Sequence, residues 1–350
     1  MKKWLLGILV LFIIPYQVVA VETSARNAIL MDMDSKRILY AKNIHEQKSV
    51  ASISKIMTAV LAVESGKLDE VVIVGEEIDK SYGSGIYIQK GEEITLRDLV
   101  YGLMLRSGND ASYAIAEYVG GESFVDMMNE KAKEIGMQET TFHNPNGLDE
   151  EEGNYSSAYD MAILTSYAMQ LEEYKKIVST KVHTVKTNKN TYHWINKHKL
   201  LFRYEYTTGG KTGFTKKAKR TLVSTASKDN LNLVVVTLND GNDFLDHVSL
   251  FNYGFSNYQS IPILKKGNLA IYDDLYYGNY NLSIEKDFSY PISQNENIMI
   301  KFELSKEPKE GSVGYAKVYL DDSEVYREII YAQEIKNYHK GLLEWFKNLW

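Results

Sequence analysis

The sequence predicts a mixed α/β (α+β) fold that is followed by a small all-β domain. Three observations support this prediction: a strand hairpin near the N-terminus, helical segments in the middle of the chain, and short alternating strands from about Ser260 onward. The chain has 350 residues, of which 44% are hydrophobic and 25% are charged. Such a chain can bury a large core and usually divides into two domains.

The first twenty residues differ from the rest and predict an export signal. Lys2 and Lys3 precede an apolar run, WLLGILVLFII, and Val18–Ala20 forms a small-residue cleavage site. We therefore expect residues 1–20 to be a secretory signal peptide. An uncleaved anchor is the alternative, although the run is shorter than the roughly 20 residues that span a bilayer. Both interpretations place the body of the protein outside the cytoplasm.

Several kinds of chemistry are excluded by composition. The chain has no cysteine, so it has no disulfides, thiolate metal sites or cysteine nucleophiles. The formal net charge is -6 and no strong basic stripe stands out, which argues against a nucleic-acid partner. The seven histidines lack metal-ligand spacing, with His193 and His198 the nearest pair, so we expect no metal site.

The N-terminal half of the expected first domain begins with a hairpin and continues with helices. NAILMDMDSKRILYAKN contains two apolar runs around an Asp34–Ser35 turn, which predicts a β-hairpin. SISKIMTAVLAVESG is apolar nearly all round at helical spacing before Gly66, which predicts a helix that is buried on most sides. Thr95 with Asp98 resembles a capping box that opens the helix LRDLVYGLML.

Strands return in the second half of this domain. TLVSTAS and LNLVVVTLND are β-rich runs, and Lys211–Thr215, just before them, is expected to be an edge strand. A helix from about Asp246 to Tyr258 closes the first domain, which we place at residues 21–258. Alternating residues such as Ile298 and Phe302 then predict a β-sandwich-like domain over residues 259–335.

The last segment, residues 336–350, predicts an amphipathic helix. In NYHKGLLEWFKNLW the aromatic and aliphatic residues fall on one arc at helical spacing, and the lysines lie on the other side. Such a helix favours the surface of a membrane. Packing on its own domain or on a partner is the alternative.

Three short motifs carry the candidate chemistry. In order they are Ser52-Ile53-Ser54-Lys55, Ser107-Gly108-Asn109 and Lys211-Thr212-Gly213. Each motif alone is common by chance. Together they are specific, because the first begins a buried helix, the second lies between two helices and the third lies on a strand.

The third motif also contains the Gly-Lys-Thr of a phosphate-binding loop. The complete phosphate motif requires a glycine five positions before Gly210, where this chain has Glu205. A carboxylate at that position would repel a triphosphate. We therefore expect Lys211 to bind a different anion.

Helical spacing explains the first motif. Residues i and i+3 face the same way on a helix, so Lys55 can reach the Ser52 hydroxyl, whereas Ser54 points elsewhere. A serine needs a base to become nucleophilic, and a lysine serves as one only while it is neutral. Burial, a helix N-terminus and the ammonium of Lys211 are expected to lower the pKa of Lys55 to near 7, at a cost of roughly 4 to 5 kcal/mol.

The motifs resemble those of the serine penicillin-recognising enzymes. Four flanking stretches narrow the resemblance to the serine-type D-alanyl-D-alanine carboxypeptidases, the low-molecular-weight penicillin-binding proteins of the serine β-lactamase-like superfamily. The stretches are ASISKIMTAVLAVESGK, EEITLRDLVYGLMLRSGNDASYAIAEYVGG, FHNPNGLDEEEGNYSSAYDMA and GGKTGFTKKAKRTLVSTA. The export signal, the β-rich domain and the amphipathic tail also fit the layout of this family.

The resemblance implies an antiparallel sheet flanked by helices, with a helical subdomain and the catalytic site between them. It implies that Ser52 is the acylated nucleophile, that Lys55 is the general base and that Ser107 and Asn109 assist them. Ser107 would relay a proton, and Asn109 would hold Lys55 and a substrate carbonyl.

The substrate-binding residues implied by the resemblance lie mostly on the third motif. Lys211 and Thr212 would bind the terminal carboxylate of the substrate, and Gly213 would let the substrate approach closely. The backbone N–H groups of Ser52 and Phe214 would bind the developing oxyanion.

The expected reaction is removal of the terminal D-alanine from peptidoglycan pentapeptide stems through a serine ester. β-Lactams would act as covalent inhibitors, and neither a metal nor another cofactor is expected. The protein would work at the outer face of the cytoplasmic membrane or in the cell wall.

Three positions depart from the family pattern, and they bear on the alternatives. Val50 and Ser54 stand where proline and threonine are usual, and Asn154 stands where many members carry histidine.

A serine β-lactamase is one alternative function, because residues 149–152 supply carboxylates that could activate water. A non-catalytic wall-binding protein of the same fold is the other, and transpeptidation by the same acyl-enzyme also stays open.

Overall fold

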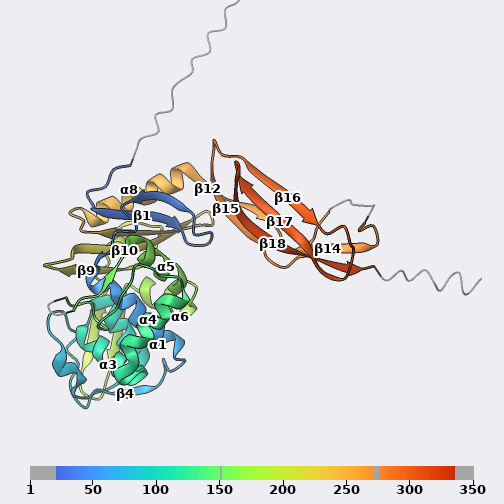
Figure 1. The fold of residues 1–350 in the computed structure, drawn as a ribbon. Coiled ribbons are helices and arrows are strands. Elements are labelled where there is room, and N and C mark those ends of the chain that lie inside the picture. The colour runs from blue at the N-terminus through green and yellow to red at the C-terminus, as the bar shows by residue number, and fades with distance from the viewer. Residues whose placement is uncertain (1–20, 150–151, 271–275, 336–350) are drawn as a thin grey trace, which may run out of the picture.

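The computed structural model describes residues 21–149, 152–270 and 276–335. The chain forms a first body of strands and helices, which ends with α8 (Asp243–Asn257), and an elongated second body made of strands (Figure 1). The expected signal peptide and C-terminal amphipathic helix lie outside these residues.

The first body is organised around a five-stranded antiparallel sheet with the strand order β2-β1-β11-β10-β9. Its strands are β1 (Asn27–Asp32), β2 (Ile38–Lys42), β9 (Thr207–Thr215), β10 (Lys219–Lys228) and β11 (Leu231–Leu238). The predicted hairpin is confirmed as β1 and β2. The predicted edge strand is also confirmed, because β9 has a partner on one side only.

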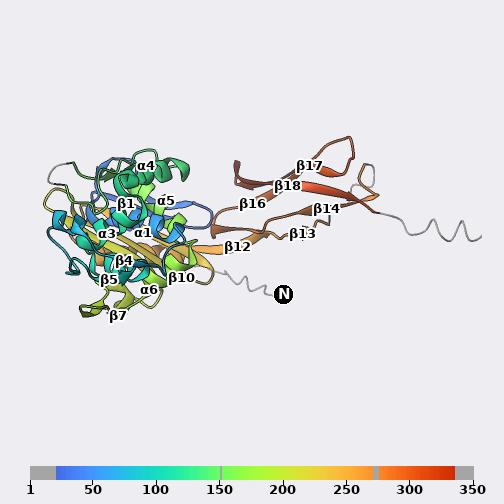
Figure 2. The same cartoon turned by 90° about the horizontal axis from the view of Figure 1, so that it is seen from below.

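Both faces of this sheet are covered, which explains why its central strands are apolar throughout. Alternate residues of a strand point to opposite faces. Val234 and Val236 of β11 pack in the large core beneath the helices, whereas Val235 packs against Leu250 and Phe251 of α8. The sheet is therefore the middle layer, with α8 on one side and the other helices mainly on the other (Figures 1 and 2).

The helices and short sheets between β2 and β9 form the rest of the first body. The helices are α1 (Lys55–Glu64), α2 (Leu96–Tyr101), α3 (Asn109–Val119), α4 (Phe124–Glu134), α5 (Ala158–Ala168), α6 (Glu172–Ser179) and α7 (Leu200–Arg203). Single turns lie at η1 (Ala51–Ser54), η2 (Glu76–Lys80), η3 (Gly102–Arg106) and η4 (Gly121–Ser123). The short strand pairs are β3 (Lys48–Ser49) with β6 (Tyr155–Ser156), β4 (Val71–Ile73) with β5 (Glu93–Thr95), and β7 (Val182–Lys186) with β8 (Thr191–Ile195).

Two helix predictions are confirmed in detail. The side chains from Lys55 to Ala62 are all buried in α1, as the apolar pattern predicts. Thr95 caps α2 by accepting a hydrogen bond from the Asp98 N–H at 3.1 Å. The α-helix nevertheless ends at Tyr101, and the chain continues as a π-helical turn to Arg106. This change of geometry leads directly into the second motif.

The second body contains two facing antiparallel sheets. The two-stranded sheet pairs β12 (Tyr258–Leu264) with β15 (Phe288–Ser293). The five-stranded sheet has the order β13-β14-β18-β17-β16, from β13 (Gly267–Asn268), β14 (Tyr280–Ile284), β16 (Ile298–Leu304), β17 (Gly311–Leu320) and β18 (Ser323–Glu334). Leu264 of the small sheet packs with Val318 and Ile330 of the large one in a shared core.

Two boundary details differ from the sequence prediction. Helix α8 begins at Asp243, three residues earlier than expected. On β16, Ile300 and Phe302 lie on the predicted apolar face but are exposed, at 36% and 42%. β16 is an edge strand, so only its ends, near Ile298 and Leu304, pack against the core.

Arg37, in the turn between β1 and β2, connects the two bodies. Its guanidinium forms a two-pronged ion pair with Glu296 and donates to the Pro291 carbonyl. It also lies 5.3 Å from the ring centre of Tyr258 and 5.1 Å from that of Tyr290. Burial alone would raise the pKa of Glu296, but the hydrogen bonds from Arg37 and Ser293 together with the Arg37 charge hold this pKa below its usual value. A planar guanidinium suits this contact, which a lysine could not reproduce.

We expect Arg37→Met to loosen the junction between the bodies. The substitution keeps an aliphatic stem but removes hydrogen bonds to a charged group, each worth about 1.5 to 3 kcal/mol. Limited proteolysis should then cut β12 faster than in the wild type. Arg327→Met is the matched control, since Arg327 pairs with Glu324 within β18. Equal cleavage of β12 in wild type and Arg37→Met would contradict this role.

Candidate active site

The first motif lies where the chain passes from the main sheet into α1. The Val50 carbonyl accepts a hydrogen bond from the Thr221 hydroxyl at 3.0 Å, which fixes the turn against β10. Ala51 then adopts a left-handed conformation with φ 51°, which is uncommon for a residue with a side chain. This bend starts η1, so that Ser52 stands at the head of the helix and Lys55 occupies the first position of α1.

A second segment packs tightly against this bend. A Cβ on Gly147 would lie 2.1 Å from the Ala51 carbonyl oxygen, and the φ of Gly147 is 81°. Both facts require glycine at this position. The loop before Gly147 therefore presses directly against the turn that presents Ser52.

Lys55 lies at the centre of the polar contacts. Its Nζ atom is 3.1 Å from the Ser52 hydroxyl and 2.7 Å from Oδ1 of Asn109, and it donates to the Asn146 carbonyl. The Ser52 hydroxyl itself is 3.5 Å from the same Asn146 oxygen. The i and i+3 spacing thus brings serine and lysine together, as the sequence predicts.

The environment of Lys55 favours its neutral form. Burial and the positive charge of Lys197 lower the pKa of Lys55 to about 7, while Asp110 acts in the opposite direction. Burial and the charges of Lys55 and Lys197 also lower the pKa of Lys211, well below its usual value. The sequence predicted that the ammonium of Lys211 lowers the Lys55 pKa, but in the structure the positive charge that does so is that of Lys197.

The second motif follows the π-helical turn η3. Ser107 has a left-handed φ of 64°, and its hydroxyl accepts a hydrogen bond from Lys211 at 2.9 Å. Asn109 begins α3, and its Nδ2 donates to the Tyr82 carbonyl at 2.6 Å. The Asp110 carboxylate binds the backbone N–H groups of the neighbouring 86–87 segment. The loop around Tyr82 is therefore fixed to the motif from two sides.

The third motif lies on β9, along the side of the first two. The buried Lys211 ammonium donates to Ser107 and, at 2.6 Å, to the carbonyl of Thr212. A Cβ on Gly213 would lie 3.0 Å from the Ser52 backbone nitrogen, so this glycine lets β9 approach the candidate nucleophile. Phe214, the next residue of β9, is 64% exposed.

The structure thus brings Ser52, Lys55 and Asn109 into contact. It also links Ser107 to Lys211 and places Gly213 against Ser52. Sequence reasoning missed three contributors: the main-chain carbonyls of Asn146 and Tyr82, and the charge of Lys197. Asn146 lies in the quoted stretch FHNPNGL, which was the available signal, but backbone acceptors have no residue-type signature.

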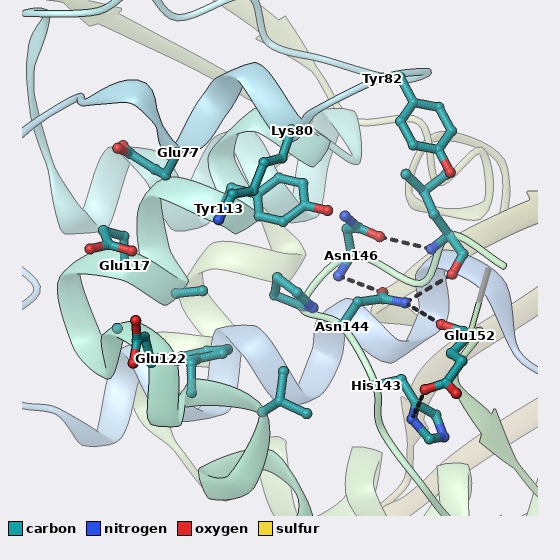
Figure 3. Close-up of a pocket in the computed structure, with 16 residues that line it drawn as sticks. Glu77, Lys80, Tyr82, Tyr113, Glu117, Glu122, His143, Asn144, Asn146 and Glu152 are labelled. Atoms are coloured by element: carbon teal, nitrogen blue, oxygen red, sulfur yellow. Dashed lines mark hydrogen bonds and ion pairs between the residues drawn. The ribbon is translucent and has the colours of Figure 1, made fainter. Parts of the chain in front are cut away.

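The residues that could activate a water molecule for deacylation, or that stand in its expected place, form hydrogen bonds or ion pairs with other parts of the protein. Asn154 is fully buried and accepts hydrogen bonds from the N–H groups of His143 and Asn144. Asp149 accepts hydrogen bonds from the hydroxyls of Ser49 at 2.7 Å and Thr215 at 2.6 Å. Glu152 forms an ion pair with His143 (Figure 3), and residues 150–151 lie outside the described residues.

These features are typical of a class of protein, the serine hydrolases in which a buried lysine lies beside the serine hydroxyl and an open strand edge. The chain matches the family described as D-alanyl-D-alanine carboxypeptidase over residues 15–242. The chain belongs to this family, which confirms the resemblance inferred from the motifs.

Individual relatives agree with this assignment. The chain is 35% identical over 280 residues to D-alanyl-D-alanine carboxypeptidase DacF of Bacillus subtilis, covering 77% of this chain and 72% of that protein. It is 31% identical over 320 residues to DacD of Escherichia coli, covering 85% and 81%. Penicillin binding protein 5 from Haemophilus influenzae aligns with a TM-score of 0.78 and 26% identity over 91% of this chain and 98% of that one. The predicted fold class is confirmed by these similarities.

We expect Lys197→Gln to raise the pKa of Lys55, because it removes a positive charge that lowers this pKa. The measurement is an NMR titration of protein labelled with ¹³C at lysine Cε, with the Lys55 signal assigned by its loss in Lys55→Met. Lys199→Gln is the control, since Lys199 lies nearby over the Phe244 ring. An unchanged Lys55 titration in Lys197→Gln would show that the Lys197 charge does not act on the site.

Proposed function

We propose that this chain is a D-alanyl-D-alanine carboxypeptidase that removes the terminal D-alanine of peptidoglycan pentapeptide stems through an ester on Ser52. The observation that carries the proposal is the buried Lys55 amine, which contacts the Ser52 hydroxyl and has a pKa of about 7. A lysine with this pKa can therefore act as a neutral base near neutral pH.

Acylation follows from this geometry. Lys55 takes the proton of the Ser52 hydroxyl while the oxygen attacks the carbonyl of the penultimate D-alanine. The N–H groups of Ser52 and Phe214 bind the oxyanion. The C–N bond then breaks, the proton passes by way of Lys55 and Ser107 to the leaving amine, and D-alanine departs. In the second step water gives a proton to Lys55 and attacks the ester carbonyl. The C–O bond to Ser52 then breaks, Lys55 returns the proton to the Ser52 oxygen, and the shortened peptide leaves as a carboxylate.

The terminal carboxylate is bound by Lys211 and Thr212 on β9. In the free site, burial and nearby charges lower the pKa of Lys211. An incoming carboxylate supplies the opposite charge, which favours the ammonium form. The free edge of β9 then accepts the substrate backbone as an additional antiparallel strand, and Asn109 holds both Lys55 and a substrate carbonyl.

β-Lactams acylate the same serine in this proposal, and their ester is long-lived. The Ser52 hydroxyl contacts Lys55 and the Asn146 carbonyl in the described structure. Of the candidate carboxylates of a β-lactamase that the structure describes, Asp149 instead receives two hydroxyl hydrogen bonds and Glu152 forms an ion pair with His143. This arrangement favours the carboxypeptidase over the β-lactamase.

The proposed location is the outer face of the cytoplasmic membrane or the cell wall. In the described parts of the chain, none of the helices is long and apolar enough to cross a membrane. The support for export is the signal-like sequence of residues 1–20, and the support for membrane attachment is the amphipathic pattern of residues 336–350.

We expect the mature protein to release D-alanine from a pentapeptide and to gain the mass of penicillin at Ser52. Ser52→Ala should abolish both, because no other described hydroxyl contacts Lys55. Ser54→Ala is the matched control, since the Ser54 hydroxyl binds the Ala51 carbonyl and faces away from the lysine. Penicillin turnover that is fast relative to D-alanine release would instead support a β-lactamase.

Deleting residues 336–350 should release the protein from membranes and leave its activity on a soluble peptide intact. The reason is that the proposed attachment rests on this segment, which follows the last described strand. Sedimentation with vesicles that contain anionic lipid measures the attachment. Equal sedimentation of the full and shortened chains would refute it.

A further inference from the structure

One long edge of the second body has no partner strand. Within the described residues, β16 (Ile298–Leu304) pairs only with β17 and ends the strand order β13-β14-β18-β17-β16 (Figure 1). The opposite edge, β13, has only two residues. An unpaired edge presents free N–H and C=O groups, which are a template for another strand.

The backbone contacts at the two ends of β16 show which groups are free. The Asn297 carbonyl accepts a hydrogen bond from the Asp321 N–H at 2.9 Å, and the Ser305 N–H donates to the Val313 carbonyl at 2.8 Å. The odd-numbered positions therefore point their backbone groups toward β17, and the register is unbroken from Ile298 to Leu304. Backbone groups alternate between the two sides of a strand. The even-numbered residues thus direct their N–H and C=O groups to the open side.

The side chains of this edge are apolar on one face. Ile300 and Phe302 lie opposite the buried Val318 and Ala316, on the face of the core, yet they are 36% and 42% exposed. An exposed edge strand that is also apolar tends to associate with another strand. A partner on the open side would cover both side chains and extend the core.

The other face of the edge carries one charge of each sign. Lys301 lies 4.7 Å from the ring centre of Tyr319, and Glu303 pairs with Lys317 at 2.6 Å. The Glu303 side chain is still 57% exposed. It can therefore accept a second cation from the open side.

A second copy of the strand fits this edge in one register. A two-fold axis pairs two identical strands antiparallel, and the free backbone groups match only when even-numbered residues face even-numbered ones. An axis through Lys301 or Glu303 would set like charges against each other, which is unfavourable. An axis through Phe302 pairs Lys301 of each copy with Glu303 of the other and Ile300 with Leu304.

We propose that the protein forms a two-fold dimer in which β16 of one copy pairs with β16 of another about Phe302. The pairing joins the two large sheets, continues their apolar face across the contact and places two ion pairs on the other face. The contact involves one short strand from each copy, so the dimer is of the weak class. The proposal is independent of the proposed reaction, because the catalytic residues lie in the first body.

Introduced thiols test the register, since the chain has no cysteine of its own. Phe302→Cys should give a covalent dimer on mild oxidation, seen on a non-reducing gel, because facing Cα atoms lie about 5.5 Å apart, within the range of a disulfide. Ile300→Cys is the matched control and should stay monomeric, since its counterpart is displaced by roughly 13 Å along the strand. Combining Ile300→Cys with Leu304→Cys should restore the covalent dimer.

A charge reversal tests the ion pairs. Lys301→Glu places like charges opposite each other at two positions, and we expect it to raise the dimer Kd about tenfold at low salt in sedimentation equilibrium. Within its own chain the new carboxylate faces Lys317, so the fold is not opposed. Adding Glu303→Lys should bring the Kd back toward the wild-type value. Lys286→Glu, on an exposed turn of the second body, is the control and should leave it unchanged.

Each outcome bears on the dimer. A wild type that stays monomeric at every concentration, together with Phe302→Cys that does not crosslink, overturns it. Equal crosslinking of Phe302→Cys and Ile300→Cys overturns the pairing about Phe302. The same Kd for Lys301→Glu and Lys286→Glu overturns the ion pairs. None of these measurements depends on catalysis, so D-alanine release tests the proposed function separately.

Discussion

The burial of one amino group, that of Lys55, is the constraint on which the rest of the site depends. A lysine in water keeps its proton at neutral pH and is useless as a base. Here α1 is enclosed on nearly all sides, and this burial together with Lys197 lowers the pKa of Lys55 to about 7. The apolar residues of α1 therefore lower the pKa of Lys55, the only lysine of this helix.

The partners of that amine come from separate elements, so the site exists only in the assembled fold. Ser52 precedes α1, Asn109 begins α3, and Asn146 lies in the loop that packs against Ala51. The loop is held by the buried amide of Asn154, which binds the main chain on both sides. Asn154 thus holds the loop in place, and deacylation in the proposed mechanism rests on Lys55.

The sequence predicts those parts of the site that depend on side-chain spacing. The i and i+3 relation selects Ser52 over Ser54, and the apolar run after it predicts that Lys55 is buried. The edge position of β9 follows from its place before a strand pair. What the sequence does not reveal is set by the backbone: the π-helical turn that puts Ser107 at φ 64°, and the carbonyl of Asn146. Neither requires a particular residue type.

The charge of Lys197 was missed for a different reason. It is distant in sequence from every motif and reaches Lys55 only through the folding of the 195–199 segment past η3. The exposed residues of β16 illustrate the same limit, because alternation predicts which face Ile300 and Phe302 share but not whether another strand covers it. Contacts between segments that are distant in sequence determine both the charge near Lys55 and the exposure of these two side chains.

The burial of a second lysine, Lys211, explains why a site built on an open strand edge would act on chain ends. An unpaired edge is a template for any extended peptide. Lys211, however, is buried beside that edge with Ser107 and a main-chain carbonyl as its hydrogen-bond acceptors. An internal peptide segment would bring only a neutral amide and leave the lysine without a counter-charge. In the proposed function a C-terminal carboxylate supplies that charge, so that the desolvated lysine would select the last residue of a chain. Gly213 would then allow the substrate backbone to lie against Ser52.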